Sequence, residues 1–174
     1  MDYPYESLSY VARLSFKDAY GLDAQFECYQ QLRVLDDELR FVTHRLWGTG
    51  DQLHDYFSTN TGLVQHTRID GKEILVSTLK EPAKRGQVFE LYSTRRIHHA
   101  FKDTSGWWEY VPFSPTRRAR VAIRYPIARE PEGISVSMSR GARAPVVQRP
   151  GTKYLVTTVD APTLGSTYRV DWNW

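Results

Sequence analysis

The segment LSYVARLSF, residues 8–16, decides the fold class of this chain. Its apolar side chains recur at every second position, and serines and Arg13 occupy most of the positions between them. A period of two residues is typical of a β-strand with one face buried and the other in water. Val11 departs from the alternation, and the rest of the segment predicts a half-buried strand.

Similar patterns follow on both sides of turn residues along the chain. Strands spaced about 8–12 residues apart are typical of antiparallel sandwiches and barrels, so we predict an all-β, antiparallel β-sandwich. Asp70-Gly71 has the composition of a two-residue hairpin turn. Residues 51–57 are the exception, because Leu53 lies three or four positions before Tyr56 and Phe57, which favours a short helical turn. The expected strands are 8–16, 24–35, 39–48, 63–69, 72–79, 87–101, 107–113, 117–126, 134–139, 153–159 and 166–174.

The chain contains one long internal similarity. VSTLKEPAKRGQVFELY (76–92) and VTTVDAPTLGSTYRVDW (156–172) share the order strand, proline, glycine, strand. Pro82 and Pro162 are expected to end a strand, because proline cannot donate a hydrogen bond to a sheet. Gly86 and Gly165 are expected to turn the backbone at positive φ.

An aromatic residue follows each of these glycines after three positions, Phe89 in one copy and Tyr168 in the other. The arrangement resembles the corner before the sixth strand of immunoglobulin-like and fibronectin type III sandwiches. The resemblance implies that the Tyr168 hydroxyl bonds to the backbone upstream of it, a role that Phe89 cannot fill. The alternative is an ordinary proline–glycine corner between two strands.

Domain organisation follows from the repeat and from a loop rich in proline and glycine after residue 126. We expect a main sandwich over 5–126 with strands of 127–174 completing or extending it, or a single domain over 5–174. The alternating aromatic residues of YRVDWNW (168–174) predict a strand packed on the core, or alternatively Trp172 or Trp174 in an interface.

Composition limits the classes of function. The chain has 174 residues, 41% of them hydrophobic, one cysteine and a net charge of +3, which indicates a globular protein without an internal disulfide. The sequence contains neither a signal-peptide pattern nor an apolar run of about 18 residues, so we expect a cytoplasmic location without membrane contact. Cys28 lies in phase with Phe26 and Leu32, which predicts a buried, inert thiol.

Catalytic and metal-binding motifs are missing from the sequence. Its five histidines show no metal-ligand spacing, and His98 and His99 are expected to point to opposite faces of a strand. The GTG at 48–50 is not followed by the lysine and helix of a phosphate-binding loop. We therefore predict a protein that is not an enzyme and needs no cofactor.

Arginines offer the main candidate surface. Arg118, Arg120 and Arg124 share one face of an expected strand, and Arg95 and Arg96 are candidates to extend it. This face could bind an anionic partner such as nucleic acid. The modest net charge favours pairing with acidic side chains of a neighbouring strand instead.

Three hypotheses for function remain from the sequence. The first is a non-catalytic binding or interaction module, by analogy with sensor and adaptor domains of bacterial signalling or defence, whose partner is another protein or domain. The second is an anion or nucleic-acid binder that uses the arginine strand. The third is a small-molecule site lined by Trp47, Tyr56 and Trp107.

Overall fold

The computed structural model describes residues 3–18, 20, 22–47, 51–69, 72–99, 101, 104–126 and 128–174. None of these residues lies in a helix, so the all-β fold is confirmed. In particular, the described part of the chain has no helix long and apolar enough to cross a membrane. The strands are β1 (Tyr5–Phe16), β2 (Asp23–Val34), β3 (Glu38–Arg45), β4 (Asp51–Ser58), β5 (Thr61–Ile69), β6 (Lys72–Lys84), β7 (Val88–His98), β8 (Ser105–Tyr110), β9 (Arg118–Arg124), β10 (Glu132–Met138), β11 (Val146–Gln148), β12 (Tyr154–Asp160) and β13 (Tyr168–Asn173).

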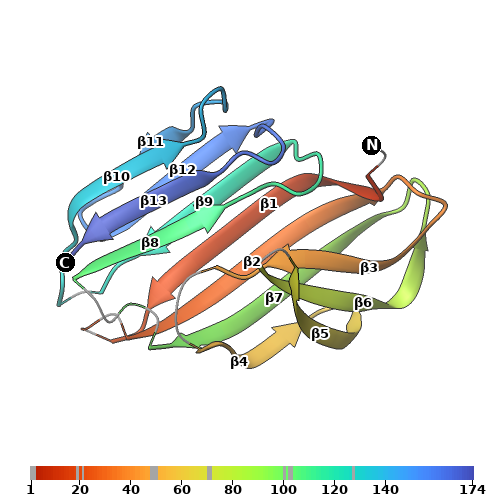
Figure 1. The fold of residues 1–174 in the computed structure, drawn as a ribbon, viewed down its shortest axis with the longest axis horizontal. Helices are drawn as coiled ribbons and strands as arrows, with labels where there is room; N and C mark the ends of the chain where they lie inside the picture. The colour runs from red at the N-terminus through yellow and green to blue at the C-terminus, as the bar shows by residue number, and fades with distance from the viewer. Residues whose placement is uncertain are drawn as a thin grey trace.

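Seven strands form one large sheet in the order β11-β12-β9-β1-β2-β7-β4 (Figure 1). Two three-stranded sheets, β10-β13-β8 and β3-β6-β5, form the second layer. Paired strands are antiparallel except β1 and β9, which run parallel. The alternation of side chains could not predict this exception, because it is the same for both strand directions.

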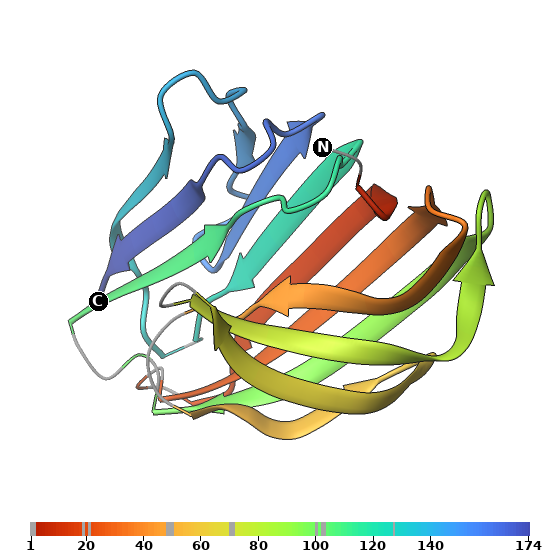
Figure 2. The ribbon, with the colours of Figure 1, turned by 45° about the vertical axis from the view of Figure 1, so that its right-hand side comes forward.

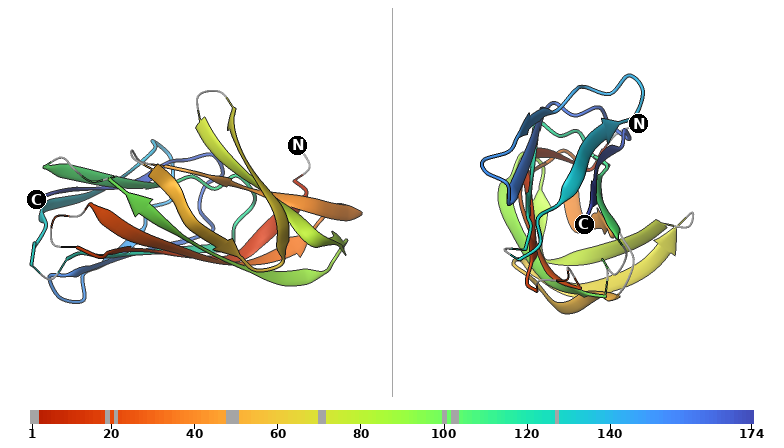
Figure 3. Two further views of the ribbon diagram at one scale, coloured as in Figure 1. Left: turned by 90° about the horizontal axis from the view of Figure 1, so that it is seen from below. Right: turned by 90° about the vertical axis from the view of Figure 1, so that its left-hand side faces the viewer.

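Both small sheets cover the same face of the large sheet, next to each other (Figures 1 and 2). The large sheet curves around them, as the views along the other axes show (Figure 3). The molecule is therefore a β-sandwich whose second layer is divided into two parts.

Each small sheet covers its own apolar cluster. The cluster beneath β10-β13-β8 is rich in aromatic rings, among them the buried Phe16, Trp108, Tyr125 and Trp172. The cluster beneath β3-β6-β5 is smaller and mainly aliphatic, and includes Leu32, Val42, Leu79 and Leu91. Because the described residues divide into two clusters rather than one, the region where the clusters meet is not filled by a continuous core.

In strand β1 the alternation of apolar residues predicts burial correctly after residue 9 and not before it. Ala12, Leu14 and Phe16 are buried, as their spacing predicts. A bulge between Ser7 and Ser9 shifts the register of β1 against β2. The shift reverses the alternation upstream of it, so Ser7 is buried at 2% exposure.

Residues 51–57 belong to strand β4, so the expected helical turn is wrong. Two register irregularities separate the pairs that Asp51, His54 and Phe57 make with β7. Asp55 between them has a positive φ of 48°. These bulges change which face successive side chains occupy, and in this strand they produce a spacing of three or four that imitates a helix.

The glycines of the two repeated corners adopt the same backbone conformation, but the prolines occupy different positions relative to the strands. Gly86 and Gly165 have positive φ, 81° and 71°, as predicted. Pro162 follows the end of β12, but Pro82 lies inside β6, so the expectation that it ends a strand is wrong. Pro82 lies opposite the bulge of β3 between Leu39 and Phe41. The two strands do not pair regularly there, so the missing N–H of proline breaks no ladder hydrogen bond.

The predicted tyrosine corner is present in the second copy. The backbone N–H of Thr163 donates to the Tyr168 hydroxyl at 2.9 Å. Tyr168 is buried and begins β13, so the bond fixes the chain at its entry into the small sheet. In the first copy, Phe89 is partly buried and packs on the aliphatic cluster instead.

Strands of the last third of the chain join both layers. β12 pairs with β9 in the large sheet, whereas β10 and β13 pair with each other and β13 with β8. The division at residue 126 stays a prediction. The Asp70-Gly71 turn and the GTG at 48–50 lie outside the described residues, although Ile69 and Lys72 pair across the expected turn.

Candidate functional site

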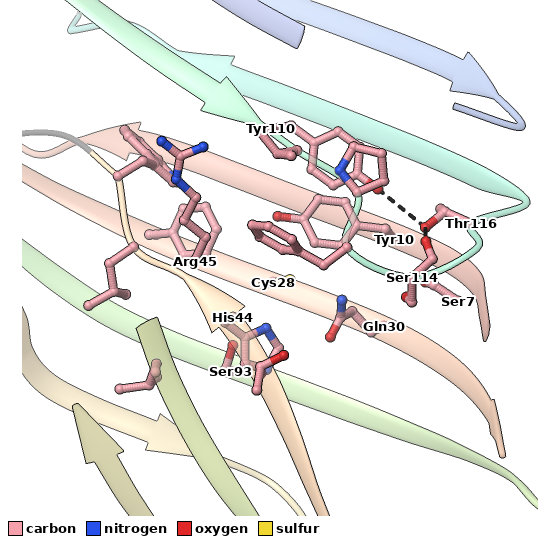
Figure 4. Close-up of a pocket in the computed structure, with 18 of the residues that line it drawn as sticks. Ser7, Tyr10, Cys28, Gln30, His44, Arg45, Ser93, Tyr110, Ser114 and Thr116 are labelled. Carbon is pink, nitrogen blue, oxygen red and sulfur yellow. Dashed lines mark hydrogen bonds between the residues drawn. The ribbon is translucent and has the colours of Figure 1, made fainter. Parts of the chain in front are cut away.

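A cavity of about 70 Å³ lies between the two layers, near the place where the two apolar clusters meet. Its floor is the inner face of the large sheet, and its roof comes from β3, β8 and the segment after β8 (Figure 4). Phe113, in the segment after β8, lines the cavity and is 41% exposed. The lining residues are Tyr5, Ser7, Tyr10, Phe26, Cys28, Gln30, Thr43, His44, Arg45, Leu46, Trp47, Tyr56, Leu75, Ser93, Arg95, Glu109, Tyr110, Val111, Pro112, Phe113, Ser114 and Thr116.

The floor is built from side chains that face inward at alternate strand positions. Tyr10 on β1 pairs with Gln30 on β2, and Cys28 pairs with Ser93 on β7. Cys28 and Ser93 are buried and small, so they leave space above the sheet where larger apolar residues would fill it. The next inward position on β7 after Ser93 is Arg95.

The roof joins the two small sheets through one ion pair. Arg45 of β3 lies 2.7 Å from Glu109 of β8, measured from Nη1 to Oε1, and both side chains are mostly buried. Trp47, just after β3, adds an edge-to-face contact with Trp108 of β8 at 5.5 Å between ring centroids. These contacts hold the two halves of the second layer together above the cavity.

Arg95 is the unusual group of the site. Only 3% of the residue is exposed, and its guanidinium carbon lies 4.7 Å from the centre of the Phe26 ring. Its Nε and Nη1 are buried without a hydrogen-bond partner among the described residues. Burial lowers the pKa of Arg95 to about 10, which still leaves it charged at neutral pH. A buried charge without a partner is costly, so it calls for a functional explanation.

Burial keeps Cys28, Tyr10 and His44 of the cavity lining neutral at pH 7. It raises the pKa of the Cys28 thiol to about 12, and it raises the pKa of Tyr10 well above its ordinary value. Burial and the Arg95 charge lower the pKa of His44 to about 4. Cys28 is thus buried and protonated, as expected for an inert thiol, and offers no thiolate nucleophile at neutral pH.

Arg118, Arg120 and Arg124 share the exposed face of β9, as their spacing predicts, and a binding role for them stays a prediction. Arg118 pairs with Asp160 of the neighbouring strand β12 at 3.3 Å, which is the cross-strand pairing favoured from the sequence. Arg124 instead lies 5.8 Å from the centre of the Tyr154 ring, and Arg120 is exposed on the same strand. Arg96 is exposed and pairs with Asp55.

Arg95 does not extend this surface, because it faces the interior from the large sheet. Its strand position has the same parity as Leu91, Ser93 and Ile97, all of which are buried. This parity was the signal in the sequence that could have placed Arg95 inside. Sequence analysis also did not identify His44 as part of a site.

The aromatic residues proposed to line a small-molecule site divide in two. Trp47 and Tyr56 line the cavity. Trp107 does not, and instead stacks under the Arg169 guanidinium at 4.7 Å. Its neighbour Trp108 is buried, so the two tryptophans point to opposite faces of β8.

Histidines come together at the edge of the large sheet, outside the cavity. The rings of His54 and His98 lie 4.5 Å apart, and His98 Nδ1 lies 2.6 Å from a carboxylate oxygen of Asp23. No group of three or more His, Cys, Asp or Glu among the described residues has an arrangement that could hold a metal ion.

The chain resembles solved structures in its fold alone. No protein-family model matches it, and no curated protein matches it. A crystal structure from Parabacteroides distasonis ATCC 8503, of a protein provisionally described as a protease, matches with a TM-score of 0.57 and 10% identity, over 98% of this chain and 40% of that one. The M1 zinc metallopeptidase from Deinococcus radiodurans matches with a TM-score of 0.50 and 14% identity, over 95% of this chain and 42% of that one. The chain thus spans less than half the length of these structures.

Proposed function

We propose that this chain is a non-catalytic binding domain that takes a small ligand into the cavity between its two layers. The observation that carries the proposal is the buried guanidinium of Arg95, whose Nε and Nη1 have no partner among the described residues. Ligand pockets typically combine apolar and aromatic walls with a few placed polar groups. Phe26, Trp47 and Leu75 supply such walls here, and Gln30 supplies a polar group.

A fragment screen tests the proposal. Neutral and charged fragments are screened by heteronuclear NMR of the labelled protein, with the Trp47 indole N–H as reporter, because this ring lines the cavity. Ser93→Leu adds apolar volume to the floor of the cavity and should abolish binding. Ser135→Leu is the matched control, because Ser135 is exposed on β10. Fragments that bind both variants equally, or no binding fragments at all, would refute the cavity as a site.

A second function is favoured by the comparison of folds. We propose that the domain also packs beside a separate catalytic domain or protein. The support is that the similar peptidase structures contain this fold as less than half of their chains. The test is co-expression with the product of a peptidase gene from the same chromosomal neighbourhood, followed by light scattering. Separate elution of the two proteins, with peptidase activity independent of this chain, would count against it.

A further inference from the structure

The charges around the cavity do not balance. Arg45 and Glu109 neutralise each other across the roof. Cys28 and His44 are neutral, because burial moves their pKa values to about 12 and about 4. Arg95 has no such compensation, since it takes part in none of the ion pairs between described residues. The described lining therefore carries one unbalanced positive charge.

Arg95 places this charge beside the cavity, which it lines. Its guanidinium carbon lies 4.7 Å from the centre of the Phe26 ring, which forms one wall. The Tyr56 hydroxyl, on another wall, lies 3.4 Å from the Ser77 hydroxyl. Gln30 and Ser93 add an amide and a hydroxyl from the floor. A guanidinium can form two parallel hydrogen bonds to one carboxylate.

The size of the cavity limits what reaches Arg95. A cavity of about 150 Å³ accommodates benzene, and this one has about 70 Å³. The space suits a carboxylate with one or two further carbon atoms, or the carboxylate end of a longer molecule that leaves past Phe113. A phosphate ester carries roughly 1.5–2 negative charges at neutral pH, so it would replace one unbalanced buried charge with another of opposite sign.

We infer that the cavity binds the carboxylate group of an organic monoanion, with the Arg95 guanidinium as its counter-ion. The inference rests on the proposed ligand-binding function and gives it a ligand class. The carboxylate neutralises the charge of the guanidinium, whose Nε and Nη1 have no partner in the described chain. The apolar part of the ligand contacts Leu46 and Leu75. Binding thus removes the cost of an unpaired buried charge.

The first experiment compares an acid with its amide on the unmodified protein. Propionate and propionamide have almost the same shape, but only propionate carries a charge. Propionate is expected to raise the melting temperature and shift the Trp47 indole signal, at constant ionic strength, whereas propionamide and inorganic phosphate should have little effect. Binding of propionamide as tight as that of propionate would overturn the inference and leave the binding function standing. Absence of binding by these probes and by the fragments described above would overturn both.

The second experiment compares two adjacent arginines. Arg95→Met keeps the length of the side chain and removes its charge, and propionate binding should weaken by about tenfold to a hundredfold. Arg96→Met is the matched control, because Arg96 is exposed on the other face of β7 and should leave binding unchanged. Equal binding by wild type and Arg95→Met would overturn the inference. If Arg95→Met does not fold, the comparison of acid and amide decides alone.

The carboxylate could belong to a small free acid or to the end of a longer molecule, and ligands of different length distinguish the two. A short peptide with a free C-terminal carboxylate is compared with propionate and with the same peptide amidated. Tighter binding of the free-acid peptide than of propionate indicates the end group of a longer ligand, and binding of propionate alone indicates a small free acid. Binding of the amidated peptide as tight as that of the acid form would contradict recognition of a carboxylate.

Discussion

His44 should make this protein less stable in mild acid. Its Nε2 is buried without a hydrogen-bond partner among the described residues, and burial together with the Arg95 charge lowers its pKa from 6.5 to about 4. Above pH 6.5 the imidazole is neutral in both the folded and the unfolded state, so it has no effect on pH dependence there. Between pH 6.5 and 4 the unfolded state binds a proton that the folded state does not, so the free energy of unfolding falls as the pH falls.

The size of this effect follows from the difference between the two pKa values. Each pH unit of difference is worth about 1.4 kcal/mol, so His44 should lower the free energy of unfolding by roughly 3 kcal/mol in all between neutral pH and pH 4. Total stabilities are typically only ~5–15 kcal/mol. A single imidazole whose Nε2 is buried should therefore account for a substantial part of the acid sensitivity.

Urea unfolding of the wild type and of His44→Gln measures the effect. Carboxylates also titrate between pH 7 and 4, but they are the same in both proteins, so the difference between the two pH profiles isolates His44. The wild type should lose roughly 2–3 kcal/mol more than His44→Gln when the pH is lowered to about 4.5. Parallel profiles for the two proteins would refute the reasoning, because they would mean that His44 is protonated equally in the folded and unfolded states.

Two further substitutions and one deletion test the packing, each measured by urea and thermal unfolding. Gly106→Ala should cost roughly 1–3 kcal/mol, because a Cβ there would overlap the fully buried Trp172 indole, whereas Gly62→Ala, on an open part of β5, should cost far less. Tyr168→Phe should cost about 1 kcal/mol, because the Thr163 N–H loses its acceptor. Deleting β13 removes the central strand of its sheet and several buried side chains worth roughly 1.5–3 kcal/mol each, so the shortened chain should not fold.

For each of these three predictions, one result would contradict the structural explanation. Equal stability of Gly106→Ala and Gly62→Ala would show that the Trp172 ring can move aside. An unchanged Tyr168→Phe protein would show that water replaces the hydroxyl. A folded protein without β13, with an unchanged melting temperature, would place this strand outside the core.

The strands were predictable because one side of each must face an apolar interior. Ala12, Leu14 and Phe16 alternate in the sequence and are buried in the fold for this reason. The errors fall where the backbone departs from a regular ladder. Asp55 has a positive φ within a bulged part of β4, and the bulges there give the apolar residues a spacing of three or four that resembles that of a helix. Pro82 lies beside another such irregularity and is tolerated inside a strand.

The candidate site was predictable only in part. The parity of β7 places Arg95 on the buried face beside Leu91 and Ile97, a signal that the sequence carries in full. The sequence does not show that this arginine lacks an acidic partner, because possible partners come from strands distant in the chain. Trp47 and Tyr56 were named for a pocket by their residue type, and only the packing of β3 and β4 around the large sheet brings them to it.

The amino-acid pattern alone is enough to predict that the chain is all-β, which face of most strands is buried, and that Tyr168 closes a corner, because these properties follow from side-chain parity and short-range backbone geometry. Only the packed fold shows that β1 and β9 run parallel, that the second layer is divided into two small sheets, and that a cavity with an unpaired Arg95 lies between the layers. These features depend on contacts between residues far apart in the sequence. Their energies depend on burial and on the distances between charges, and both exist only once the sheets have packed.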